Sequence, residues 1–459
     1  MKSAIPVYAV AGGVSSFARA RPDRTFAGLV LEAYQRMLAD LGLPFARARE
    51  VIEGSVASYF SDHFADQAMA GIMAQEAMGL CPAPGHRVEA GGATGGVCLQ
   101  EAWKAIASGS MDTCLAFGFE IMSSVNAWKG NEFIALASDT RFDYPLGGFY
   151  TAYYAMMAAR HMKEFGTTPE DFSLAAVKNR RNACFNPFAQ NPGDYSLEEI
   201  RASAPVAWPL SFLDICVMSD GAALVLLASE EGLRKIDRAA GRLPPRVRLS
   251  GIGRGSDFMR LADREQGEVP LLPHESPGEY AGEKFLGGRL SYPGAHSFRA
   301  GRLAAREAYQ QAGVENPLAD LDFVELHDAF SSSELQTYED LGLCRYGESG
   351  AFIRSGAPFL KSVEYRIEEN GEARAGLYLH MKRKGEIPVN PSGGLLACAH
   401  PIGATGLMQA VFALWQLQGV TGARFGNDAL QIPDAKRGAV HSHAGTGTYV
   451  TVTILEREN

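Results

Sequence analysis

The sequence has few cysteines, and none of them has the spacing of a metal-binding or redox pair. Its 459 residues contain seven cysteines, an odd number, without a C-x-x-C motif. This excludes a disulfide framework and argues against a zinc ribbon within the chain. Reduced thiols are typical of the cytoplasm, which is therefore the compartment that we predict.

Long apolar runs and net positive charge are also missing. No uninterrupted apolar segment reaches the ~20 residues that span a bilayer, and Pro6, Gly12 and Gly13 interrupt the N-terminal apolar stretch. This end of the chain predicts a first strand followed by a glycine turn rather than a signal peptide. A formal net charge of −9 gives no general attraction to nucleic acid or to an anionic membrane. We therefore expect neither kind of partner.

Glycine, in contrast, is abundant. The chain has 50 glycines, is 46% hydrophobic and shows no short repeat. An excess of glycine in an apolar, non-repetitive chain indicates many tight turns between strands and helices. The predicted fold class is therefore α/β, and the length alone allows about three domains.

One pattern occurs twice along the chain. Three matches keep the same order and local context in both copies: residues 32–35 and 307–310 (Glu-Ala-Tyr-Gln) in helices that end at glycine, residues 92–95 and 403–406 (Gly-Ala-Thr-Gly) at helix starts, and residues 219–231 and 445–457 in glycine turns that lead into apolar strands. Ordered matches of this kind predict a duplicated α/β unit.

The matches divide the chain into an N-terminal half, residues 1–240, and a C-terminal half, residues 241–459. Within the first half, residues 121–210 separate two of the matched segments and predict an inserted cap, whose Met- and Tyr-rich helix we assign to the core. The second half carries a charged stretch at 352–388 with a hairpin-like Glu-Asn-Gly-Glu turn at 369–372.

Three histidines stand where ligand sites of α/β proteins gather. His327 ends an apolar strand, His400 precedes a helix start, and His443 lies in a glycine turn. A single histidine in such a place is usually a satisfied core residue, but three together favour a functional site. No carboxylate or cysteine lies beside them at metal-ligand spacing, so we predict no metal in this chain.

Long motifs around these histidines resemble those of the thiolase superfamily, in its sterol-carrier-protein-type branch. They are NPSGGLLACAHPIGATG at 390–406, VELHDAFSSSELQTYEDLGLC at 324–344 and VKNRRNACFNPFAQ at 177–190. The resemblance runs from about residue 5 to the C-terminus. It implies a five-layered α/β/α/β/α fold built from two duplicated halves, with an inserted loop domain.

The resemblance also implies an activity and partners. Members cleave or form a carbon–carbon bond in a β-oxo or β-hydroxy acyl-CoA, so coenzyme A is the implied substrate or cosubstrate. They are usually homodimers or dimers of dimers. Bacterial members of this branch often pair with a small zinc-ribbon/OB-fold subunit, which would be a separate chain here.

Roles carry over to five positions. His400 matches the histidine that activates the nucleophile and helps to bind the thioester oxygen, and His327 matches the one that completes this oxyanion hole through a water. His443 aligns with a second acid/base position. The backbone N–H groups of Gly92 and Gly445 match a second oxyanion hole.

Gly92 is the departure from the family pattern, because it stands where the nucleophilic cysteine belongs. Cys98, six residues later, is rotated far around the helix, and for Cys398, two residues before His400, we also favour a packing role. A retro-aldol cleavage needs a base and oxyanion donors but no thiol.

Several functions therefore stay open: a thiolase-type acyltransferase with altered chemistry, a cysteine-less retro-aldolase of a branched or bulky 3-hydroxyacyl-CoA, an ordinary thiolase in which the cysteine has been replaced, and a non-catalytic acyl-CoA-binding subunit. Aldolases of this branch tend to carry tyrosine where this chain has His327, which weakens that alternative. Retention of His327 and His400 in full motif context speaks against the non-catalytic one.

Overall fold

The computed structural model describes residues 5–264, 267–268, 270–276, 291–292, 297–367 and 383–458, so the turn expected at 369–372 lies outside the described residues. Nine strands form one large sheet in the order β11-β12-β13-β8-β1-β7-β4-β2-β3. Their bounds are β1 Tyr8–Val14, β2 Gly54–Ser58, β3 Gly85–Val88, β4 Thr113–Ile121, β7 Asp220–Ala228, β8 Val247–Ser256, β11 Phe323–Glu325, β12 Arg437–Ala444 and β13 Tyr449–Arg457.

The sheet contains the same strand arrangement twice. In the first copy β2 runs parallel to β4, and β4, β7 and β1 follow with antiparallel pairing. In the second copy β11 runs parallel to β12, and β12, β13 and β8 follow in the same way. Only two residue pairs, Tyr8 with Arg248 and Ala9 with Val247, join the copies between β1 and β8. The boundary at residue 240 stays a prediction.

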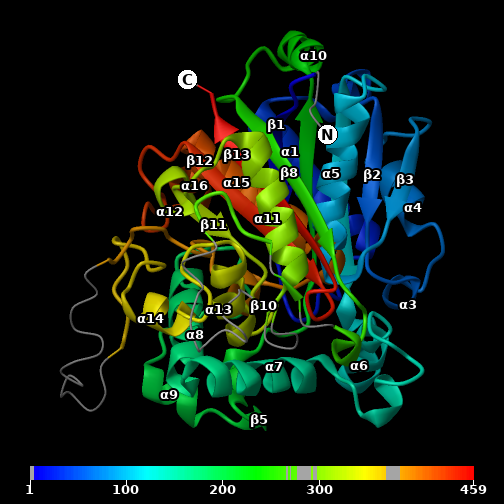
Figure 1. Ribbon diagram of the computed structural model, residues 1–459. Coiled ribbons are helices and arrows are strands. Elements are labelled where there is room, and N and C mark those ends of the chain that lie inside the picture. The colour runs from blue at the N-terminus through cyan, green and yellow to red at the C-terminus, as the bar shows by residue number, and fades with distance from the viewer. Residues whose placement is uncertain are drawn as a thin grey trace.

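Helices enclose and separate the two copies (Figure 1). Helix α1 (Phe26–Leu41) packs on β1, β4 and β7, and α11 (Arg299–Ala312) packs on β8 and β13. Between the copies lie α5 (Thr94–Ala107) and α15 (Thr405–Gln418), which contact each other and strands of both copies. The predicted α/β/α/β/α fold is confirmed.

The two central helices cross at the recurring Gly-Ala-Thr-Gly sequences. A Cβ atom on Gly406 would lie 2.3 Å from the amide nitrogen of Gly96, and one on Gly95 would lie 2.7 Å from that of Gly406. Only glycine lets two backbones approach this closely. The repeated motif therefore sets the distance between the starts of α5 and α15.

Between β4 and β7 the chain forms a mostly helical segment, which Figure 1 shows along the lower end of the view. It contains α6 (Ala127–Ala135), α7 (Tyr150–Phe165), α8 (Pro169–Ala183), α9 (Leu197–Ala202) and the strand pair β5 (Pro205–Ala207) and β6 (Leu210–Ser211). Across the described ranges, no helix combines the length and the apolarity that crossing a bilayer requires.

The described residues form further α-helices and β-strands. They are α2 Ala48–Val51, α3 Asp62–Ala65, α4 Ala70–Ala77, α10 Glu230–Ala240, α12 Pro317–Asp320, α13 Ser331–Asp340, α14 Ser349–Arg354, α16 Thr421–Phe425, β9 Gly267–Glu268 and β10 Ser291–Tyr292.

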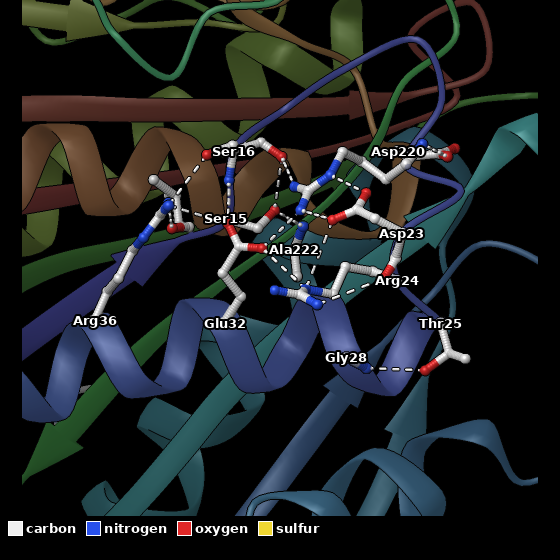
Figure 2. Close-up of polar contacts among 12 residues, drawn as sticks. Ser15, Ser16, Asp23, Arg24, Thr25, Gly28, Glu32, Arg36, Asp220 and Ala222 are labelled. Atoms are coloured by element: carbon white, nitrogen blue, oxygen red, sulfur yellow. Dashed lines mark hydrogen bonds and ion pairs between the residues drawn. The ribbon is translucent and has the colours of Figure 1, made fainter.

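The loop between β1 and α1 is fastened by charged hydrogen bonds (Figure 2). The Arg21 guanidinium donates to the Ser16 carbonyl at 2.8 Å and to Glu32 at 2.9 Å. Asp220, at the start of β7, accepts the Arg21 amide at 2.8 Å and the Ser123 amide at 2.9 Å. Because charge-assisted bonds are the strong ones, the loop and the end of β4 are held at the start of β7.

Candidate active site

Four histidine side chains gather near the carboxyl ends of β11 and β12. His327 follows β11, His400 precedes α15, and His441 and His443 lie on the same face of β12. The ring centroid of His327 lies 5.0 Å from that of His400 and 4.2 Å from that of His443. The structure thus brings the three predicted histidines together. It adds His441, which the two-residue spacing in His-Ser-His could have indicated.

Gly92 lies directly against this cluster. It belongs to the short 3₁₀ helix η2 (Gly91–Ala93) that precedes α5. A Cβ atom on Gly92 would lie 3.2 Å from Cε1 of His327 and 2.6 Å from the backbone oxygen of His443. The second distance is shorter than real Cβ contacts, so any side chain at position 92 requires the backbone of η2 or the end of β12 to shift.

His400 is held by hydroxyl groups on both sides. Its amide donates to Ser219 Oγ at 2.8 Å, and its Nδ1 lies 2.8 Å from Thr405 Oγ1. The Thr405 hydroxyl also reaches the Pro401 carbonyl at 3.1 Å. Because this hydroxyl has a single hydrogen, both contacts are hydrogen bonds only in the tautomer in which Nδ1 of His400 donates to Thr405 and Nε2 carries the lone pair. Burial lowers the pKa of His400 to about 4, so the ring is a neutral base at pH 7.

The other three imidazoles are almost completely enclosed, with at most 3% of the surface of each residue exposed. Burial lowers the pKa of His441 to about 3. Burial, together with the repulsion that neighbouring imidazolium charges would exert, lowers the pKa of His327 and His443 well below the usual value. The cluster is therefore uncharged near neutral pH, which suits proton transfer and hydrogen bonding to an oxygen.

Tyr154 of α7 also belongs to the site, although the sequence assigned its helix to the core. Its hydroxyl lies 2.6 Å from Nε2 of His443 and donates to the Gly445 carbonyl at 2.8 Å. The ring stacks on Phe330 with centroids 4.3 Å apart. Helical periodicity predicted a buried aromatic ring correctly, but it carries no information on the partner of the hydroxyl.

Asp328 fixes the segments that carry His327 and His400 relative to each other. Its carboxyl accepts the amides of Leu395 at 2.7 Å and Leu396 at 3.3 Å, and the side-chain amide of Asn179 at 2.6 Å. A Cβ atom on Gly394 would lie 2.3 Å from Asp328 Oδ2. The three long motifs of the sequence therefore meet at this carboxyl.

The cysteines nearest the site by sequence are buried in the core and are not activated as nucleophiles. Cys98 Sγ donates to the Val56 carbonyl at 3.1 Å, and Cys398 Sγ accepts from Asn186 Nδ2 at 3.4 Å. Burial raises the pKa of both thiols, and it raises the pKa of Cys216 to about 12. Because the thiolate is the nucleophile, these three groups lack nucleophilic character at pH 7.

Gly92 and Gly445, whose amides are the predicted oxyanion donors, are only partly buried. A pocket opens beside Gly445. Its other lining residues are Ala137, Ser138, Asp143, Tyr150, Tyr153, Met259, Leu261, Thr446 and Thr448. Among the described residues, no three His, Cys, Asp or Glu side chains are arranged to hold a metal ion.

Comparison with known proteins agrees with this architecture. The chain matches the thiolase N-terminal domain over residues 7–193 and the thiolase C-terminal domain over residues 291–363 and 360–457. It is 33% identical to an acetyl-CoA acetyltransferase of Methanothermobacter thermautotrophicus over 95% of both chains. It is 30% identical to human sterol carrier protein 2, over 98% of this chain and 72% of that protein.

A solved structure of an aldolase, Ltp2-ChsH2(DUF35), shares the fold, with a TM-score of 0.70, 24% identity and 98% coverage of both chains. Two domain matches that together span most of the sequence, and a relative aligned over almost its whole length, establish the identity. The chain belongs to the thiolase family.

Proposed function

We propose that this protein cleaves, or in reverse forms, the carbon–carbon bond of a 3-hydroxyacyl-CoA by retro-aldol chemistry without a cysteine nucleophile. One observation carries the proposal: the backbone oxygen of His443 occupies the space that a side chain at position 92 would need. Acyl transfer through a thioester intermediate requires a nucleophile at that point. A retro-aldol reaction does not.

The neighbouring groups supply what such a reaction needs. Nε2 of His400 takes the proton of the C3 hydroxyl. The C2–C3 bond then breaks, C3 leaves as a ketone or aldehyde, and the electron pair forms the enolate of the thioester. A proton added to C2 gives the shortened acyl-CoA. No electron acceptor and no free coenzyme A are consumed.

The enolate oxygen requires donors, since its negative charge develops in the transition state. His327 and the amides of Gly92 and Gly445 are the proposed donors. Amides in the first turn of a helix, such as that of Gly92 in η2, have no acceptor within the helix. Loss of one such donor typically costs on the order of 10²–10³ in rate.

Acyl-CoA is the proposed substrate class, because relatives of this chain are named as acetyl-CoA acetyltransferases. The pocket beside Gly445, lined by Tyr150 and Met259 among others, is the proposed site of the acyl substituent. A separate small subunit of the DUF35 type, as the name of the similar Ltp2-ChsH2(DUF35) aldolase includes, is the proposed partner.

The competing function is thiolysis, in which free coenzyme A attacks a 3-ketoacyl-CoA. It is favoured by 33% identity to an acetyl-CoA acetyltransferase over 95% of the chain. Two assays separate the functions. The protein is incubated with a 3-hydroxy-3-methyl acyl-CoA without free coenzyme A, and separately with a 3-ketoacyl-CoA and free coenzyme A.

We expect ketone release in the first assay and none of the thiolysis product in the second. His400→Ala should lower ketone release by a factor of about 10² or more. The matched variant Cys398→Ala, which removes a buried thiol two residues away, should keep the rate. Thiolysis without ketone release, or an unchanged rate in His400→Ala, contradicts the proposal.

A further inference from the structure

The hydroxyl of Tyr154 lies between a histidine nitrogen and a carbonyl oxygen. It donates to the Gly445 carbonyl at 2.8 Å, and it lies 2.6 Å from Nε2 of His443. A carbonyl oxygen can only accept, and a phenol has a single hydrogen. Both contacts are therefore hydrogen bonds at once only when the hydrogen between Tyr154 and His443 belongs to Nε2. Nδ1 of His443 then carries the lone pair.

The surroundings of Nδ1 agree with this assignment. This atom is buried and has no hydrogen-bond partner among the described residues. Most buried polar atoms in proteins have a partner, so an atom without one calls for an explanation such as a function. Besides Tyr154, His327 and His441 are titratable neighbours of the ring, with ring centroids 4.2 Å and 5.5 Å away.

The position of the tyrosine itself is strongly constrained. Its ring stacks on Phe330, which follows the His327-Asp328 pair, and its edge faces Phe298 with centroids 6.5 Å apart. Tyr150, Arg264 and Cys216 are the charged or titratable groups outside the histidine cluster that act on its hydroxyl. Helix α7 therefore presents this hydroxyl to β12 in one orientation.

We propose that Tyr154 is a positioning residue that holds His443 in the Nε2–H tautomer, so that Nδ1 exchanges the proton with C2 of the acyl-CoA. This inference rests on the proposed function. In the condensation direction Nδ1 removes a proton from C2, and the electron pair of that C–H bond forms the enolate. The imidazolium then donates through Nε2–H to Tyr154. In the cleavage direction the same proton returns to C2.

The tautomer can be measured without any substrate. In the full-length protein labelled with ¹⁵N-histidine, two-bond ¹H–¹⁵N couplings distinguish Nε2–H from Nδ1–H, and the signals that disappear in His443→Gln assign the residue. We expect His443 to be the Nε2–H tautomer in the wild type, and to gain Nδ1–H in Tyr154→Phe. An Nδ1–H tautomer in the wild type, or the same tautomer ratio in Tyr154→Phe, overturns the proposal.

The second measurement follows exchange of the C2 protons of propionyl-CoA in D₂O by mass spectrometry. Tyr154→Phe should lower the maximal exchange rate by about tenfold or more, with KM changed by less than about threefold. Tyr309→Phe is the matched control, because the Tyr309 hydroxyl is equally buried and donates to the Leu341 carbonyl at 2.8 Å, on the outer helix α11. Equal exchange in the wild type and in Tyr154→Phe contradicts the role of Tyr154.

Different results would contradict the retro-aldol proposal and the proposed role of Tyr154. If the wild type exchanges C2 protons but releases no ketone from any 3-hydroxyacyl-CoA, retro-aldol cleavage is wrong while the role of Tyr154 stands. If ketone is released but His443 is the Nδ1–H tautomer, the role of Tyr154 is wrong while retro-aldol cleavage stands.

Discussion

At the scale of single residues, the proposed chemistry depends on Gly92. The nearest atoms to a Cβ at this position belong to the backbone of His443 and to the ring of His327. Backbone atoms yield less easily than the tip of a flexible side chain. A substitution here therefore perturbs the two histidines before the new side chain acts.

Gly92→Ala should lower the free energy of unfolding by about 1–3 kcal/mol, the usual cost of overpacking, and should abolish the proton transfer that depends on His327 and His443. Chemical denaturation and the C2 exchange assay measure the two effects. Gly92→Cys should show the same destabilisation and no thiolysis. Wild-type stability in Gly92→Ala contradicts the contact described.

The buried carboxyl group of Glu120 on β4 should make the stability of the protein depend on pH. One oxygen accepts the amides of Phe60 at 2.8 Å and Gly403 at 3.0 Å, while the other is buried without a partner among the described residues. Burial raises the pKa of Glu120 to about 8 from 4.5. Between these values the folded chain keeps a proton that the unfolded chain releases, so the stability that this proton provides decreases as pH rises.

Gln at position 120 resembles the protonated acid at every pH. Glu120→Gln should match the wild type in unfolding free energy at pH 4.5, and should exceed it by at least about 1 kcal/mol at pH 8. Urea denaturation across this range measures the difference. A difference that does not depend on pH would show that Glu120 keeps its ordinary pKa in the folded protein.

At the scale of elements, the crossing of α5 and α15 holds the two sheet copies together. A methyl group on Gly406 would meet the backbone nitrogen of Gly96 at 2.3 Å. Gly28, in the first turn of α1, differs because its Cβ would meet the flexible Arg24 side chain at 3.3 Å. Substituting each of these two helical glycines by alanine therefore distinguishes the effect of helix propensity from the effect of packing between helices.

Gly406→Ala should lower the unfolding free energy by about 1–3 kcal/mol, because the helices must separate. Gly28→Ala should leave it unchanged or raise it by up to about 1 kcal/mol, since alanine favours a helix over glycine. Thermal and urea denaturation of the two variants provide the comparison. Similar effects of both substitutions would rule out a special role for the crossing.

At the scale of the whole molecule, the described sheet ends at β3. This strand pairs with β2 alone in the nine-stranded order, and its residues are partly or fully exposed. An edge strand presents unpaired backbone groups to another chain, and symmetric dimers are the commonest oligomers. Light scattering in solution should therefore give at least twice the mass of one chain. The mass of a single chain contradicts the predicted homodimer.

The sequence predicted much of the architecture, because repeats and glycine positions are local signals. The recurring residues 92–95 and 403–406 do start the two central helices, and both Glu-Ala-Tyr-Gln helices end at a glycine with positive φ, Gly42 and Gly313. The role proposed for Tyr154 and the close approach of Gly92 to His443 were not predictable in this way. Both depend on distances between segments far apart in the chain, which only packing determines.

The lack of space for a side chain at position 92 also limits which substitutions the chain accepts there. A single substitution to cysteine supplies sulfur but places its Cβ 2.6 Å from the backbone oxygen of His443. A thiol nucleophile at this position therefore requires the backbone of η2 or the end of β12 to shift as well. The position of one carbonyl group thus separates the retro-aldol chemistry that we propose from thiolysis by more than a single substitution.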